Sequence, residues 1–121
     1  TGFKNNPLDY IAASNVYLST SRWEGLPYSL IEASMMGLPS VATNVVGNNE
    51  VVKNNLNGKL FNPGDLKTAV SNIVEICTDN NLFEFYSKNA KIFYKDNFSV
   101  DKMISKMQSI YDDLYINVLK K

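Results

Sequence analysis

The order of the apolar segments is the feature that most restricts the fold. Strand-like segments at 15–20, 39–43 and 58–61 alternate with helix-like segments at 28–37 and 47–55. Parallel strands need a crossover connection, so this alternation is typical of a parallel sheet. The first of these strands lacks a strict polar and apolar alternation, as do strands that are covered on both faces. The sequence therefore predicts an α/β protein.

A turn sequence at residues 62–65 precedes a change in character, because every later apolar pattern is helical. Asp65 is a good N-cap for the first of these helices. The apolar residues at helical spacing are Leu66, Ala69, Val70, Ile73 and Cys77, then Leu82, Phe83, Tyr86, Ala90 and Phe93, then Val100, Met103, Ile104, Met107, Ile110, Tyr111, Leu114 and Val118. We expect one domain over 1–121, with an α/β part at 1–65 and a helical part at 66–121.

The first residues predict the end of a strand at Gly2-Phe3, and Pro7 predicts the start of a short helix that reaches about Ala13. The first strand is therefore expected to begin before Thr1. With so few strands, the chain is expected to be the second part of a larger domain.

Charge and rare residues exclude several classes of function. Twelve basic side chains balance twelve acidic ones without a basic cluster, so we expect no nucleic-acid partner. The chain has no histidine, which excludes histidine-based catalysis and histidine metal ligands within it. The single cysteine, Cys77, cannot form an intramolecular disulfide, and we expect a reduced core residue of a cytoplasmic protein. No apolar run is long enough to span a bilayer.

The loop at 19–29 is the candidate functional segment, because ligands of open parallel sheets bind at the carboxyl ends of the strands. Gly25 allows close approach of the backbone, and Pro27 fixes the entry into the next helix. The amides of Tyr28, Ser29 and Leu30 are then expected to be free donors that favour an anion such as phosphate.

Two carboxylates flank this helix start, with Glu32 eight positions after Glu24. Carboxylates accept hydrogen bonds from hydroxyls, so the pair and the anion seat suit a nucleotide sugar. The alternative is a solvated loop acid at Glu24, with Glu32 on an exposed helix stripe beside Ser29 and Met36. Composition alone favours this second interpretation.

The segment "SRWEGLPYSLIEASMMGLPSVATNVVGNNEVV", followed by "NGKLFNPGD", resembles the carboxy-terminal, nucleotide-sugar-binding domain of retaining GT-B glycosyltransferases (glycosyl transferases group 1, family 4 type). The resemblance rests on E-x7-E at Glu24 and Glu32, supported by "GLP" at 37–39, Gly47 with Glu50, and "PGD" at 63–65. It covers almost the whole chain. It implies a partial Rossmann-like parallel sheet, half of a GT-B enzyme, with helices on its faces and a helical carboxy-terminal segment.

The resemblance also implies roles for residues. Glu24 corresponds to the catalytic-site acid that contacts donor-sugar hydroxyls, and Glu32 to the acid that holds the ribose. The remaining donor-binding positions are Gly25, Leu26, Pro27, Tyr28, Ser29 and Leu30, near the sugar and diphosphate. Many members have an aromatic residue and a glycine where this chain has Leu26-Pro27, which removes one backbone donor.

Five further residues are expected to line the cleft: Arg22, Thr43, Asn44, Gly47 and Glu50. A surface or ion-pair role is favoured for Arg22. For Glu50, a site residue and an acid that interacts with a helix dipole are equally supported.

As a member of this family, the chain would belong to a hexosyltransferase that moves a sugar, with retention, from a nucleotide diphosphate donor to a carbohydrate or lipid-linked acceptor. Polysaccharide or lipopolysaccharide synthesis is the implied context. No cofactor or metal is expected. The acceptor site would lie in a missing amino-terminal domain, so the chain alone would be inactive. That domain could also associate with the inner face of the membrane. The last helix is expected to be partly exposed or to make oligomer contacts.

Two alternatives to this function stay open at the level of sequence. One is another GT-B enzyme, such as a non-hydrolysing sugar epimerase. The other is a noncatalytic α/β interaction module. A phospho-receiver domain is disfavoured, because the strand at 15–20 ends in hydroxyl residues and not in an aspartate.

Overall fold

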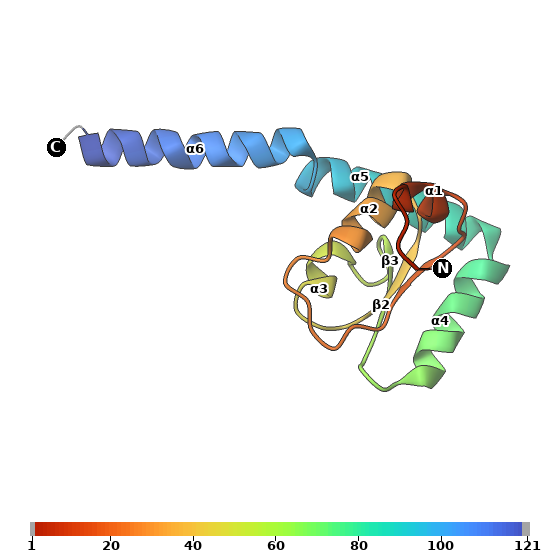
Figure 1. Ribbon diagram of the computed structural model, residues 1–121. Coiled ribbons are helices and arrows are strands. Elements are labelled where there is room, and N and C mark those ends of the chain that lie inside the picture. Colours follow the sequence, from red (N-terminus) through yellow and green to blue (C-terminus); the bar gives the residue numbers. More distant parts are fainter. Residues whose placement is uncertain (1, 120–121) are drawn as a thin grey trace.

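The computed structural model describes residues 2–119 and shows a three-stranded sheet surrounded by helices (Figure 1). In chain order the elements are α1 (Pro7–Ala12), β1 (Tyr17–Ser19), α2 (Tyr28–Met36), β2 (Ser40–Thr43), α3 (Asn48–Val51), β3 (Gly58–Phe61), α4 (Leu66–Thr78), α5 (Asn80–Asn97) and α6 (Val100–Leu119). The predicted α/β class is confirmed.

The sheet is parallel throughout, with the strand order β1-β2-β3. Ser40 of β2 pairs with Tyr17 on one side and with Gly58 on the other. Helices α2 and α3 lie in the two crossovers, which is the connection that parallel strands require. The carboxyl ends of the strands therefore lie at one edge of the sheet, where the loops after β1 and β2 begin.

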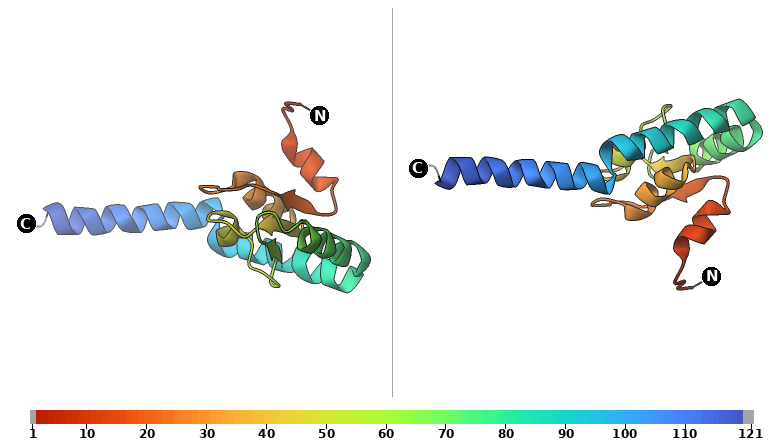
Figure 2. Two further views of the ribbon diagram at one scale, coloured as in Figure 1. Left: turned by 90° about the horizontal axis from the view of Figure 1, so that it is seen from below. Right: turned by 90° about the horizontal axis from the view of Figure 1, so that it is seen from above.

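The central strand β2 is buried along its whole length, because helices cover both faces of the sheet (Figure 2). Ala42 packs against Leu30 and Ile31 of α2 on one face. Val41 points to the other face and packs with Ile76 of α4 and Tyr86 of α5. Successive side chains of a strand alternate between faces, so one short strand joins two apolar clusters.

Local signals set the predicted helix ends. Gly37 ends α2 in the left-handed conformation, at φ +74°, which glycine adopts without steric cost. Asp65 caps α4 by accepting a hydrogen bond from the amide of Thr68 at 3.0 Å. Asp79 caps α5 in the same way through the amide of Leu82, also at 3.0 Å. Each cap satisfies a donor that the helix leaves free.

Helix α6 extends away from the rest of the molecule (Figures 1 and 2). Residues 100–118 are all exposed, including the large apolar side chains of Met103, Met107, Ile110 and Leu114. This confirms the expected exposure of the last helix, while the expected oligomer contact stays a prediction. No helix within residues 2–119 combines the length and apolar character needed to cross a membrane.

Two sequence predictions are wrong, the strand at Gly2-Phe3 and the burial of Cys77. Gly2-Phe3 belongs to no strand and Phe3 is 91% exposed, since no neighbouring strand pairs with this segment. On α4, Leu66 and Val70 are exposed, because the helix turns Ala69 and Ile76 toward the sheet instead. Cys77 is exposed as well, and is no core residue. The division at residue 65 stays a prediction, and its outer limits, residues 1 and 120–121, lie outside the described residues.

Candidate functional site

The loop after β1 holds Glu24 in a half-buried position. The hydroxyl of Ser21 donates a hydrogen bond to Oε1 of Glu24 at 2.6 Å. Within residues 2–119, Oε2 of Glu24 has no hydrogen-bond partner. The second oxygen is therefore available to accept a hydrogen bond from a ligand hydroxyl.

Two residues at the end of β2 and the start of α3 support this loop. Thr43 is buried, and its hydroxyl donates a hydrogen bond to the carbonyl oxygen of Ser21. Asn48 is fully buried and donates from Nδ2 to Oγ1 of Thr43 at 3.0 Å. The side chains of Ser21, Thr43, Asn48 and Glu24 thus belong to one polar cluster at the carboxyl edge of the sheet.

Close approach of the backbone is required at Gly47 and not at Gly25. Gly47 has φ +86°, and a Cβ there would clash with the carbonyl oxygen of Gly25 and lie 2.9 Å from Cβ of Glu24. Gly25, which the sequence favoured for this role, has no neighbouring protein atom within 4 Å of the place a Cβ would take. Open space thus lies beside the backbone that follows Glu24.

The start of α2 offers fewer free donors than predicted. The amide of Leu30 donates to the carbonyl oxygen of Pro27 at 3.0 Å, and the amide of Ile31 donates to the same oxygen at 3.2 Å. The assignment of Leu30 as a free donor is therefore wrong, because a tight first turn uses its amide. In the described part of the chain, the amides of Tyr28 and Ser29 make no hydrogen bond.

Glu32 lies on α2 in a half-buried position and lines a cavity of about 490 Å³. Leu26 and Tyr28 line the same cavity, together with Phe98, which lies between α5 and α6, and Met103 of α6. Its residues are Leu8, Leu26, Tyr28, Ile31, Glu32, Met35, Tyr94, Asn97, Phe98, Val100, Met103 and Lys106. Leu26, Tyr28 and Glu32 thus lie around one cavity. Glu24 is not among the residues that line it.

The predicted cleft residues do not all lie at one site. Thr43 belongs to the polar cluster around Glu24, and Gly47 lies against Glu24. Arg22 and Asn44 are exposed. Glu50, in the first turn of α3, lines a second cavity of about 360 Å³ with Lys53, Phe93, Asn97, Phe98 and Lys106. Among residues 2–119, no three acidic or cysteine side chains come together as a metal site.

Two candidate functional residues, Ser21 and Asn48, were not predicted from the sequence. Ser21 stands three positions before Glu24, a spacing from which a serine hydroxyl can reach an acid in a turn, so this signal was available. Asn48 gave no such signal, because its contact with Thr43 depends on how α3 packs under the loop.

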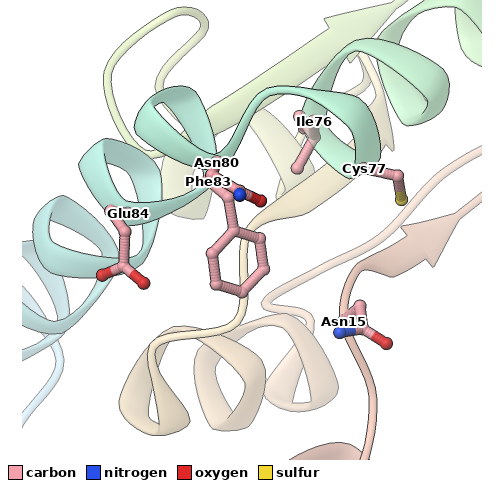
Figure 3. A pocket seen from close by; sticks show the side chains of 6 residues that line it. All are labelled: Asn15, Ile76, Cys77, Asn80, Phe83 and Glu84. Carbon is pink, nitrogen blue, oxygen red and sulfur yellow. The ribbon is translucent and has the colours of Figure 1, made fainter.

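A third cavity lies at the opposite edge of the sheet, near the start of β1. It has a volume of about 500 Å³ and is lined by Asn15, Ile76, Cys77, Asn80, Phe83 and Glu84. The thiol of Cys77 points toward the segment that carries Asn15 (Figure 3). This cavity shares no residue with the Glu24 cluster.

The perturbed pKa values belong to the scaffold. Hydrogen bonds from Thr68 lower the pKa of Asp65 below its ordinary value. Burial raises the pKa of Tyr86. Burial alone would lower the pKa of Lys59, but its ion pair with Glu75, at 3.1 Å, and the neighbouring Tyr86 outweigh burial and raise it.

A parallel sheet with a carboxylate and free amides near its carboxyl edge is an arrangement in which α/β proteins commonly bind ligands. Residues 1–93 match the model of the family described as Glycosyl transferases group 1. The chain belongs to this family of GT-B glycosyltransferases.

Relatives and solved structures agree with this assignment. A UDP-Gal:alpha-D-GlcNAc-diphosphoundecaprenol alpha-1,3-galactosyltransferase of Escherichia coli is 32% identical over 116 residues, which are 96% of this chain and 30% of that protein. Sucrose-phosphate synthase from Thermosynechococcus elongatus is 26% identical with a TM-score of 0.82, over 89% of this chain and 27% of that one. Anabaena HepE in complex with UDP-glucose is 24% identical with a TM-score of 0.84, over 94% and 32% of the two chains. The chain thus spans about 30% of the length of the first of these relatives.

Proposed function

We propose that this chain is the donor-binding part of a retaining hexosyltransferase. The enzyme would transfer a sugar from a nucleotide diphosphate sugar to a carbohydrate or lipid-linked acceptor in polysaccharide or lipopolysaccharide synthesis. The observation that carries the proposal is the carboxylate of Glu24, which one hydroxyl holds through Oε1 while Oε2 stays free beside open backbone at Gly25.

The proposed roles follow the chemistry of the residues. Oε2 of Glu24 accepts a hydrogen bond from a hydroxyl of the donor sugar. The free amides of Tyr28 and Ser29 favour the diphosphate, and they act together with the positive end of α2. Glu32 accepts hydrogen bonds from the ribose hydroxyls, next to the ring of Tyr28 in the same cavity.

The relatives support a donor of this class. The galactosyltransferase of Escherichia coli is named for a UDP sugar and a lipid-linked acceptor, and HepE was solved with UDP-glucose. We propose that the acceptor site lies in an amino-terminal domain, that this chain alone is inactive, and that no metal is needed. We further propose that the enzyme works in the cytoplasm, where this domain could bring it to the inner face of the membrane.

The test is a screen of nucleotide sugars by mass spectrometry with the protein expressed at the length its gene encodes. We expect transfer or hydrolysis of one donor. Glu24→Ala should reduce turnover by about 100-fold or more, because a contact to the reacting sugar is lost. Glu32→Gln should weaken donor use, and Glu84→Ala, an exposed acid on α5, is the matched control. Unchanged turnover in both site variants would disprove the site.

A further inference from the structure

We propose that Asn48, Thr43 and Ser21 are positioning residues that hold the carboxylate of Glu24 in place for the donor sugar. This inference rests on the proposed function, because it concerns the same carboxylate. It adds a hydrogen-bonded chain that runs from the buried start of α3 to the loop after β1.

The chain begins at Asn48, whose side chain is fully buried. Its Nδ2 lies 3.0 Å from Oγ1 of Thr43 and 3.1 Å from the carbonyl oxygen of the same residue. A carbonyl oxygen can only accept a hydrogen bond, so the side-chain atom that faces it must be the amide nitrogen. This contact fixes the orientation of the Asn48 amide and makes it the donor.

The next two hydrogen bonds lead to Glu24. The hydroxyl of Thr43 accepts from Asn48, and it donates to the carbonyl oxygen of Ser21. The hydroxyl of Ser21 then donates to Oε1 of Glu24 at 2.6 Å. A weaker branch runs through Oγ of Ser19, which lies 3.4 Å from Nδ2 of Asn48 and 3.5 Å from Oγ of Ser21. Both branches end on Ser21.

The last donor, the hydroxyl of Ser21, points to the carboxylate, whereas the hydroxyl of Thr43 points to the backbone carbonyl oxygen of Ser21. A hydrogen bond to a carboxylate is stronger than one between neutral groups. Thr43 fixes the backbone of Ser21, and Ser21 fixes Oε1, so rotation of the Glu24 side chain is restricted before a ligand arrives. Ordering a side chain in advance reduces the entropy cost of binding.

The side-chain oxygen of Asn48, unlike its nitrogen, takes no part in the hydrogen bonds described above. This oxygen, Oδ1, is buried and has no hydrogen-bond partner within the described residues. An unsatisfied buried acceptor is destabilising, and an apolar side chain would avoid this cost. A buried polar side chain that is only partly hydrogen-bonded, at the start of a hydrogen-bonded chain toward a carboxylate, is typical of a functional position.

The experiment compares two kinds of ligand, nucleotide sugars and nucleotides, on the protein at the length its gene encodes. Isothermal titration gives the Kd of UDP-glucose, UDP-galactose and GDP-mannose, and of UDP and GDP alone. For the donor that binds most tightly, the ratio of the nucleotide Kd to the nucleotide-sugar Kd measures the contribution of the sugar. Ser21→Ala and Thr43→Val should each lower this ratio by about tenfold, while the Kd of the nucleotide alone stays unchanged. Ser21→Thr should restore the ratio.

The control is Ser105→Ala on α6, because this hydroxyl also makes one hydrogen bond, to the carbonyl oxygen of Asp101. Thermal unfolding of each variant identifies loss of folding, and if Ser21→Ala does not fold, Thr43→Val compared with Thr43→Ser decides. An unchanged ratio in these variants beside a lowered ratio in Glu24→Ala would overturn the positioning chain alone. An equal loss of nucleotide and nucleotide-sugar binding would also overturn it, as a merely structural effect. Absence of binding to every ligand would overturn the proposed function with it.

Discussion

Gly47 lies directly against Glu24, and a Cβ at Gly47 would stand 2.9 Å from Cβ of the glutamate. Gly47 also has a positive φ of 86°, so two separate constraints act on one residue. The loops after β1 and β2 therefore fit together only when position 47 has no side chain, and a substitution there should affect both the fold and the site.

Gly47→Ala should lower the free energy of unfolding by about 1–3 kcal/mol for the strained backbone with a positive φ and by about 1–3 kcal/mol more for the clash with Gly25 and Glu24. Gly64→Ala is the matched control, because Gly64 has a φ of 87° but no neighbouring atom within 4 Å of the added Cβ. Urea denaturation of both variants measures the difference. Equal losses of unfolding free energy in the two variants would show that the loops after β1 and β2 can move apart without cost.

Glu24 and Glu32 should be distinguishable by binding, because Glu32 lines the cavity beside Tyr28 and Glu24 does not. We expect Glu32→Gln to weaken the binding of UDP and of UDP-sugars equally, by about tenfold, since it would remove a contact to the ribose. Glu24→Gln should weaken only the nucleotide sugar. Titration calorimetry separates the two patterns, and the same pattern in both variants would contradict the proposed roles.

Asp65 should make stability depend on pH at the acidic end. Its folded pKa is lowered by the hydrogen bonds from Thr68, while the ordinary value is 3.8. A lowered folded pKa stabilises the folded state above the ordinary value, and this contribution is lost as the pH falls through the folded pKa. Asp65→Asn should therefore unfold more easily than the parent at pH 6, and the difference should shrink below pH 3.8.

The control for this experiment is Asp112→Asn on α6, a site where the helix interior offers no capping role. Thermal unfolding at a series of pH values provides the measurement. A difference between Asp65→Asn and the parent that does not change with pH would mean that the charge of the cap contributes nothing.

Cys77 should react with a thiol reagent such as maleimide while the protein is folded, because its side chain is exposed. We expect one modification per chain without denaturant, as counted by mass spectrometry, and none in Cys77→Ser. Reaction only after denaturation would support the burial that the sequence predicted.

The two sides of α4 should respond differently to truncation. Ile76 is 1% exposed and packs with Val41 and Tyr86, so Ile76→Ala should cost about 2–5 kcal/mol of unfolding free energy. Val70 is 59% exposed, and Val70→Ala should change stability by about 0.5 kcal/mol or less. Chemical denaturation tests both variants. A large loss of unfolding free energy in Val70→Ala would mean that this side of α4 is buried in solution.

Features set by neighbouring residues were predictable. Gly37 ends α2 and Asp65 caps α4 as expected, because caps depend on a few adjacent residues. The strands β2 and β3 were found for a similar reason, since each is a short apolar run beside a turn. The resemblance to GT-B glycosyltransferases also identified the family, which the comparisons confirm.

Features set by distant contacts were not predictable. A strand at Phe3 needs a partner strand to pair with, and the exposed side of α4 depends on how the helix meets Phe61 and Tyr86 across the core. In the site, the use of the Leu30 amide by Pro27 and the position of Asn48 under Thr43 are three-dimensional relationships. Periodicity reports which residues can share a helix face, but the sheet decides which face it covers.

Helix α6 differs from helices α2 to α5 in what stabilises it. Helices α2 to α5 contribute side chains to the two apolar clusters on the sheet, whereas residues 100–118 of α6 belong to neither cluster and are exposed. Most of the stability of a helix in a protein comes from the packing of its apolar face. The helicity of α6 should therefore depend on its surroundings, and amide hydrogen exchange should be much faster along α6 than in α5. The amides of α6 would then become protected from exchange only when another surface covers this helix.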